Sequence, residues 1–257
     1  MTEGPTAKYQ AIRIKTVAND ESITNIETKS KLARVDLKKL IGKKIEDVET
    51  FGKNIVIIVG DYAIRLHLMM YGSIHIYSLS EKLAKPESQV RLFIQLETKK
   101  IVVYNAPIVE IDYKGKVIRN LVSSLGPDPL RKDWNPQKAI KLILKHKNRK
   151  IGDVLLDQGV IAGIGNILRN EILFRAGVHP DRLVKDLSIL EVERIVSFSK
   201  ELSEEFFERR MRHERIKPML MVYNRYNKPC FICGTPIKFY RQQPNGRKTF
   251  VCEHCQK

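Results

Sequence analysis

The sequence predicts an α+β protein with more than one domain: a β-sandwich or barrel, then a helical region, then a short cysteine-bearing hairpin. Three observations support this prediction. Short β-branched runs separated by turn signals fill the first half of the chain, apolar residues at helical spacing fill much of the second half, and all four cysteines fall in the last 28 residues. A length of 257 residues allows one or two large domains.

The strand prediction depends on short apolar runs in the first half. Residues 54–59 read Asn-Ile-Val-Ile-Ile-Val, and Gly60 and Asp61 then give a turn signal. Further runs lie at 62–68, 73–77, 90–96 and 101–104. Several short strands at this spacing are typical of a sandwich or a barrel.

The helix prediction depends on caps and spacing in the second half. Asn135 followed by Pro136 is a good N-cap and first-turn pair for a helix over 137–147. Ser188 with Glu191 fits a capping box. Apolar residues recur at helical spacing after this box, which we interpret as core packing: Ile195, Phe198, Leu202 and Phe206.

The cysteines form two Cys-x-x-Cys pairs, Cys230 with Cys233 and Cys252 with Cys255, separated by eighteen residues. Thiolates in this arrangement can close a tetrahedral zinc site across a β-hairpin. Disulfide or redox use is the alternative, but the N-terminus lacks the apolar core of a signal peptide and no stretch is long and apolar enough to span a membrane. We therefore expect one structural zinc ion, no membrane contact, and a cytoplasmic or nucleoid-associated protein that is not secreted.

The charge of the chain favours a polyanionic partner. The net charge is +17, and residues 131–257 carry 26 Lys and Arg against 14 Asp and Glu. Four of these cations lie between the cysteine pairs: Lys238, Arg241, Arg247 and Lys248. Basic residues can also merely solvate a surface, but cations on a metal-held hairpin favour nucleic-acid binding.

A glycine-rich segment at 157–168 is the second candidate binding element. Gly163 and Gly165 would let backbone N–H groups approach a ligand closely, and Asn166 adds a side-chain donor. The residues that follow, 167–176, read as a helix whose N-terminal N–H groups favour an anion. The motif alone is also compatible with plain helix packing, but a basic hairpin downstream favours phosphate binding.

Together these residues resemble the formamidopyrimidine-DNA glycosylase and endonuclease VIII family of base-excision repair enzymes. The resemblance covers nearly the whole chain and depends on four blocks in the family order, with residues 125–128 matching the family's interdomain stretch: Glu3-Gly4-Pro5, Phe51-Gly52-Lys53, residues 158–180, and the hairpin ending in residues 252–256. It implies a β-sandwich catalytic domain with an N-terminal helix at 1–121 and a linker at 122–134. A helical domain with a helix–two-turn–helix motif at 135–225 and a zinc finger at 226–257 follow.

Within the family, the endonuclease VIII branch is the more similar. Met69, Met70 and Tyr71 resemble the loop whose side chains fill the gap left by an everted base. The alternative is that the methionines are core residues at a strand end. Asn105-Ala106 and residues 222–225 also resemble this branch, whose usual substrates are oxidised pyrimidines.

The resemblance implies a bifunctional DNA glycosylase and abasic-site lyase. In the family, an N-terminal amine attacks C1′ of the damaged nucleoside, forms a Schiff base, and strand cleavage by β/δ-elimination follows. The nucleophile position is Thr2, and Glu3 is placed to shuttle protons. Lys53 matches a lysine that contacts phosphate near the lesion and assists catalysis. Asn166 and Arg247 match the pair that holds phosphate from two sides.

Two positions depart from the family pattern, because Thr2 replaces the usual proline and Thr6 stands where a glutamate is common. We therefore carry a second hypothesis, a protein that binds damaged or abasic DNA but excises poorly or not at all. A zinc-ribbon RNA-binding protein is disfavoured because it leaves the N-terminal block unexplained. The expected partner is damaged double-stranded DNA, with no nucleotide cofactor, and the expected state is a monomer.

Overall fold

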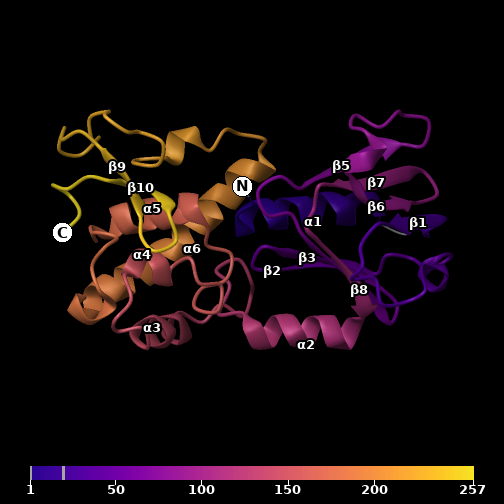
Figure 1. Ribbon diagram of the computed structural model, residues 1–257, viewed down its shortest axis with the longest axis horizontal. Helices are drawn as coiled ribbons and strands as arrows, with labels where there is room; N and C mark the ends of the chain where they lie inside the picture. The colour runs from indigo at the N-terminus through magenta and orange to yellow at the C-terminus, as the bar shows by residue number, and fades with distance from the viewer. Residues whose placement is uncertain (1, 19–20) are drawn as a thin grey trace. The chain divides into compact units, whose positions relative to one another are not determined.

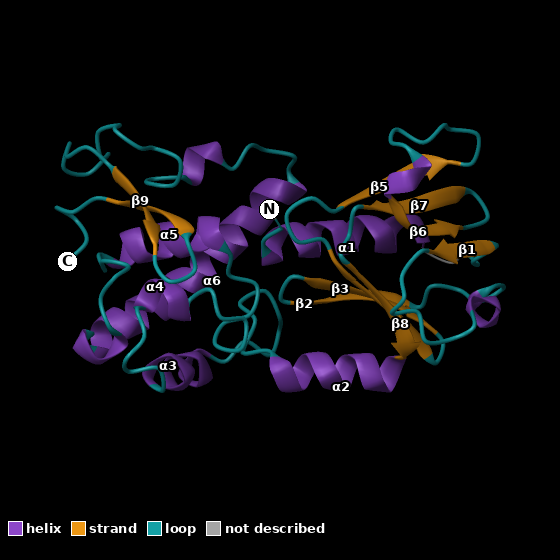
Figure 2. Ribbon diagram, in the orientation of Figure 1, coloured by secondary structure: helices purple, strands orange, loops and turns teal. Residues whose placement is uncertain are grey.

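The computed structural model describes residues 2–18 and 21–257, and the chain divides into two compact units. The first comprises Thr2 and residues 6–123, and the second comprises residues 3–5 and 124–257. Figure 2 shows strands dominating the first unit and helices the second. Among the described helices, none is long and apolar enough to cross a membrane.

The first unit holds two antiparallel four-stranded sheets. One has the order β2 (Asp47–Phe51), β3 (Asn54–Val59), β4 (Tyr62–His67), β8 (Ile108–Tyr113). The other has the order β1 (Asn25–Thr28), β6 (Val90–Gln95), β7 (Lys99–Tyr104), β5 (Ser73–Ser78). The short helices η1 (Leu37–Leu40) and η2 (Glu87–Gln89) and all but the end residues of helices α1 (Gly4–Ala18) and α2 (Lys114–Ser124) complete it. The sheets form a sandwich rather than a closed barrel.

The core of this unit includes a helix as well as the two sheets. Every residue of β3 is buried, and Ile55, Ile57 and Val59 face the common core. Helix α1 contributes apolar residues at helical spacing to the same core, three of them alanines: Ala7, Ala11, Ile14 and Ala18. Figure 1 shows α1 running alongside strands of both sheets. Alanine side chains let the helix axis approach the sheets closely, so α1 is fixed by packing.

The second unit is helical and carries the hairpin. Its elements are α3 (Pro136–Leu144), α4 (Ile151–Val154), α5 (Asn166–Ala176), η3 (Val184–Asp186), α6 (Ile189–Met211), η4 (Lys217–Met219), β9 (Lys238–Gln242) and β10 (Arg247–Val251). The predicted caps are confirmed, because Asn135 accepts from the Lys138 N–H at 2.8 Å and Ser188 and Glu191 form a capping box. Helix α3 ends before the predicted residue 147, since residues 145–149 turn back on themselves. The predicted fold class is confirmed.

Helix α5 is the central element of the second unit. Glu171 on this helix is fully buried and accepts the backbone N–H groups of Met221, Val222 and Tyr223 at 2.7, 3.1 and 2.8 Å. Burial raises the pKa of Glu171, and these three hydrogen bonds oppose that shift. Each buried donor left without a partner would cost about 1–3 kcal/mol. Glu171 therefore fixes the segment after α6 against α5.

Candidate nucleic-acid-binding and catalytic site

The N-terminus of α5 is occupied by a carboxylate of the protein itself. Glu3 is fully buried, and its two carboxylate oxygens accept the N–H groups of Gly165 at 2.6 Å and Ile167 at 2.9 Å. The N–H of Gly4 donates to the Gly163 carbonyl at 2.9 Å. Free N–H groups and the positive end of the helix dipole stabilise a negative charge at this position. The N–H groups of Gly165 and Ile167, which the sequence suggested for binding phosphate, thus donate hydrogen bonds to Glu3 instead.

Two different constraints require the glycines of this loop. A Cβ on Gly165 would lie 2.4–2.5 Å from the Glu3 carboxylate, a distance that real Cβ atoms do not tolerate. Gly163 has a φ of +89°, in the region that favours glycine. The Gly163 N–H donates to Gln158 Oε1 at 2.9 Å. The Gly-x-Gly pattern therefore serves the chain's own residues 3–5, and phosphate binding by these two glycines stays a prediction.

Thr2 is held in the first unit by the loop that was predicted to act as a wedge. It is 7% exposed, and its backbone nitrogen donates to the Met69 carbonyl at 3.0 Å. Met69, Met70 and Tyr71 are 46%, 52% and 78% exposed. The methionines are therefore not core residues, and the loop offers three large side chains to solvent. A wedge role for them stays a prediction.

His67 supports this loop, although the sequence gave no signal for it. Its Nδ1 accepts the N–H of Met69 at 3.2 Å, and Met69 has a φ of +46°, which is uncommon for a residue with a side chain. Burial lowers the pKa of His67 to about 4, with further contributions from the positive charges of Lys53 and Arg65. A neutral imidazole keeps an acceptor for the Met69 N–H. Half-buried Lys53 thus lies close enough to His67 to lower the pKa of the imidazole.

In the second unit, α5 and the hairpin are joined by a cluster of polar side chains. The Lys248 carbonyl accepts from Asn166 Nδ2 at 2.9 Å, Arg169 Nη2 at 3.1 Å and Asn170 Nδ2 at 3.4 Å. The Phe250 N–H donates to Asn170 Oδ1 at 2.8 Å. Arg169 is fully buried, and burial lowers its pKa to about 10. The position of β10 is therefore set by α5.

The two residues that were predicted to bind phosphate differ in exposure and in their contacts. Asn166 is 3% exposed and holds the hairpin, whereas Arg247 at the start of β10 is exposed. Tyr223 completes the surroundings of Asn166. Burial raises the pKa of this phenol, a hydrogen bond with Asn166 lowers it, and the negative charge of Glu3 raises it. The structure thus gathers Glu3, Asn166 and Tyr223 around the start of α5, a set that sequence spacing could not reveal.

The four cysteines converge at the base of the hairpin, and their sulfur atoms all lie within 4.8 Å of one another. Cys230 Sγ lies 3.9 Å from Cys255 Sγ, and Cys233 Sγ lies 3.4 Å from Cys252 Sγ. A tetrahedral ion with Zn–S bonds of about 2.3 Å sets sulfur atoms about 3.8 Å apart. Burial and neighbouring sulfur atoms raise the pKa of Cys252 and Cys255, while hydrogen bonds from Thr235 lower that of Cys233 to about 6. The cluster fits a metal ion that displaces the thiol protons.

Comparison with known proteins finds matching family models and relatives. Two family models match, the formamidopyrimidine-DNA glycosylase N-terminal domain over residues 1–107 and the formamidopyrimidine-DNA glycosylase H2TH domain over residues 125–217. A probable endonuclease 8 of Streptomyces coelicolor is 30% identical over 100% of this chain and 94% of its own length. The chain belongs to the formamidopyrimidine-DNA glycosylase and endonuclease VIII family.

Other members of this family of DNA-repair glycosylases agree with the assignment. A formamidopyrimidine-DNA glycosylase of Listeria innocua is 31% identical over 85% of this chain and 84% of its own length. The human endonuclease 8-like 3 is 32% identical over 82% of this chain, but that match covers 34% of the human protein. The fold matches the Lactococcus lactis Fpg solved with abasic-site DNA, with a TM-score of 0.88, 21% identity and 99% coverage of both chains.

Protonation of His67 should weaken the support of the Met69 loop. The folded pKa is about 4 and that of an unfolded histidine is about 6.5, so the unfolded chain binds the extra proton between these values. The stability that neutral His67 contributes is full above about pH 6.5 and is lost as pH falls through about 4. An NMR titration of the imidazole, together with unfolding free energies across this range, measures both effects.

The matched control for this titration is His67→Gln. Its unfolding free energy should depend less on pH between about 4 and 6.5 than that of the wild type. The remaining slope belongs to groups such as His75 and His179, whose pKa values burial also lowers. A His67 resonance that titrates near pH 6.5, or a slope unchanged in the variant, would show that His67 does not act as the neutral acceptor.

Proposed function

We propose that this family member is a bifunctional enzyme that removes oxidised bases from DNA and cleaves the resulting abasic site through the α-amine of Thr2. The observation that carries the proposal is the fixed position of the Thr2 nitrogen, which donates a hydrogen bond to the Met69 carbonyl. Thr2 directly precedes Glu3, which is buried. An α-amine has a pKa of about 7.7–8.0, so a substantial fraction is unprotonated at neutral pH. This amine exists once Met1, which lies outside the described residues, has been removed.

The proposed reaction has two stages. The Thr2 amine forms a bond to C1′ while the bond between C1′ and the base breaks, and the base leaves with a proton. The C1′–O4′ bond of the sugar ring then breaks as O4′ takes a proton, which leaves an iminium between C1′ and the Thr2 nitrogen. This iminium acidifies C2′, so removal of a C2′ proton breaks the C3′–O bond and releases the phosphate. A carboxylate can carry protons in both stages, and we assign this role to Glu3, whose position two backbone N–H groups fix. Lys53 is assigned to the phosphate near the lesion.

The primary amine of Thr2 differs from a proline amine in one useful respect. Its iminium carries an N–H and can lose that proton to give a neutral imine, so the lyase stage does not depend on a proline ring. The Thr2 backbone N–H donates a hydrogen bond to the Met69 carbonyl, and the residue is buried. We infer that these contacts orient the amine in place of the ring.

We propose damaged double-stranded DNA as the partner, with oxidised pyrimidines as the lesion class and a monomer as the active form. Support comes from the similarity to an endonuclease 8 of Streptomyces coelicolor and from the fold shared with a Lactococcus lactis Fpg bound to abasic-site DNA. Met69, Met70 and Tyr71 are proposed to fill the gap left by an everted base, since all three are exposed on one tight loop.

The phosphate contacts are proposed to come from the start of α5 and the hairpin. Arg247 is exposed and can pair with a phosphate oxygen directly. Asn166, whose Nδ2 donates to the Lys248 carbonyl, is proposed as the contact from the start of α5. Gly163 and Gly165 are assigned the narrower role of letting the N-terminal segment pack against this loop.

The alternative function is binding of damaged or abasic DNA without efficient excision, and borohydride trapping distinguishes the two. Wild-type protein whose N-terminal residue is confirmed as Thr2 by mass spectrometry is incubated with a thymine-glycol duplex or an abasic duplex, with and without borohydride. We expect a covalent protein–DNA adduct and, without reductant, a nicked strand. A matched protein that retains Met1 should give neither product.

Two outcomes would change the assignment. If wild-type protein binds the abasic duplex but gives no adduct and no nick, the binding-only alternative is correct. If the protein that retains Met1 still forms an adduct that Lys53→Ala abolishes, then Lys53 rather than Thr2 is the nucleophile. Thr2→Pro serves as a positive control because it restores the amine that is usual in the family.

We also propose that the four cysteines hold one structural zinc ion. Metal analysis of the purified protein should give one zinc per chain, and Cys252→Ser should lose it together with the folded hairpin, because the core of the hairpin includes Cys230 and Cys252. Gln243→Ala, an exposed change in the same hairpin, should retain both. Full hairpin structure in a zinc-free protein would contradict the proposal.

A further inference from the structure

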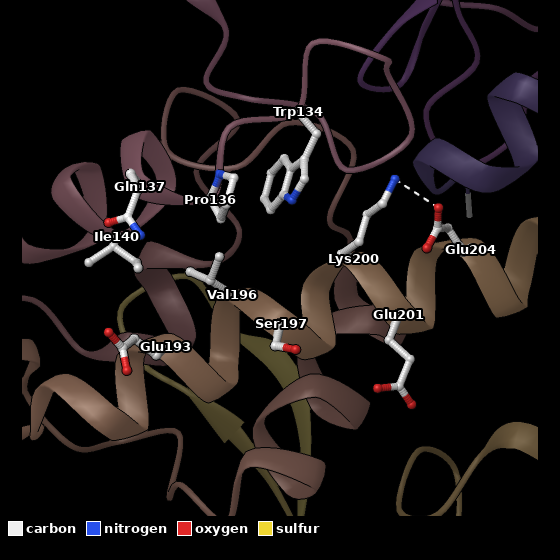
Figure 3. A pocket seen from close by; sticks show the side chains of 10 residues that line it. All are labelled: Trp134, Pro136, Gln137, Ile140, Glu193, Val196, Ser197, Lys200, Glu201 and Glu204. Atoms are coloured by element: carbon white, nitrogen blue, oxygen red, sulfur yellow. Dashed lines mark ion pairs between the residues drawn. The ribbon is translucent and has the colours of Figure 1, made fainter.

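The second unit has a groove that the proposed DNA chemistry does not use. It lies between the N-terminal end of α3 and one face of α6 and has a volume of about 480 Å³. The apolar part of its lining includes half-buried Trp134 with Ile140 and Val196, which are 9% and 2% exposed. Figure 3 shows the indole of Trp134 above α6, between Pro136 and Lys200. The groove can receive one or two apolar side chains.

The charge of this groove is opposite to that of the protein. Glu193, Glu201 and Glu204 line it, all exposed, and Lys200 is the one basic residue among its lining residues. Lys200 Nζ is 2.8 Å from Glu204 and donates to the Pro129 carbonyl at 2.7 Å, so its charge is compensated. Glu193 and Glu201 make no ion pair within the described part of the chain. A chain with net charge +17 therefore carries a locally negative groove.

The apolar surface continues beyond the groove along α6. Leu190, in the first turn of this helix, is 64% exposed and precedes Glu193 by three residues, so both lie on the same helix face. Its neighbour Ile189 is 51% exposed. Large exposed apolar side chains beside an apolar groove with a charged rim are typical of a surface that binds another protein.

We propose that this groove docks a basic segment of a partner protein. One apolar side chain of the segment would pack against Trp134, and its Lys or Arg side chains would pair with Glu193 and Glu201. Charge complementarity selects this occupant, because the carboxylates repel phosphate and so exclude nucleic acid, and they favour a cationic peptide. The site is small and its charges are exposed, so binding should be weak, salt-dependent and transient.

Trp134 is the one tryptophan of the chain, so its fluorescence reports on the groove directly. The probe is a synthetic peptide of about ten residues with a central leucine flanked by arginines and lysines, titrated into the full-length protein. We expect a saturable fluorescence change that weakens as salt rises. The same peptide with glutamates in place of its cations, or with serine in place of leucine, should bind at least several-fold more weakly.

Charge reversal in the groove is the matched test. Glu193→Lys/Glu201→Lys should weaken peptide binding at least about tenfold, whereas Glu27→Lys/Glu97→Lys, the same charge change at exposed sites of the first unit, should leave it unchanged. If the double variant fails to fold by circular dichroism, Ser197→Phe, which fills the groove without a charge change, replaces it and should abolish the fluorescence response.

Four outcomes would overturn the proposal. They are equal binding of the basic and acidic peptides, unchanged affinity in the groove variants, competition by a DNA duplex for the Trp134 response, and a response to protein concentration alone with a dimer in analytical ultracentrifugation. The last outcome would assign the groove to a second copy of this chain. None of these depends on whether the protein excises bases.

Discussion

The structure depends on one buried charge, the carboxylate of Glu3 at the N-terminus of α5. A charged group taken out of water is costly unless hydrogen bonds replace its hydration, and here the N–H groups of Gly165 and Ile167 supply them. Gly165 is required because this contact leaves no room for a Cβ at its position. The preceding residue, Thr2, belongs to the first unit, where its backbone N–H donates a hydrogen bond to the Met69 carbonyl. The proposed nucleophile and the proposed proton carrier are thus adjacent in sequence and individually fixed.

Helix α5 connects this charge to the rest of the second unit. Nine of its eleven residues are buried, including Asn166, Arg169, Asn170 and Glu171. The first three hold the Lys248 carbonyl of the hairpin, and Glu171 holds the segment at 221–223. A buried polar network of this kind tolerates little displacement, since each lost partner leaves a buried group without a hydrogen bond. The same helix therefore fixes Glu3 at one end and, through the hairpin, the residue proposed to hold phosphate.

Local patterns predicted much of this architecture from the sequence. The β3 run, the Asn135 cap, the capping box at Ser188 and the cysteine pairs are short-range signals, and the structure has each of them. Long-range pairings could not be predicted in this way. Glu3 and Gly165 are 162 residues apart, and the polar residues of α5 look like an exposed helix face in sequence. His67 was missed because its role depends on a backbone N–H two residues further along, in a left-handed conformation.

The most direct test of this account is the rate of borohydride trapping on abasic DNA for Gly165→Ala. The added Cβ would collide with the Glu3 carboxylate and should displace residues 2–3. We predict that trapping slows at least about tenfold, equivalent to about 1.4 kcal/mol, while affinity for the abasic duplex changes less. Gly159→Ala, where the nearest atom is 3.3 Å away, should trap at the wild-type rate. A Gly165→Ala protein that is folded and traps as fast as wild type would contradict the claim that the contact between Glu3 and α5 positions the reacting N-terminus.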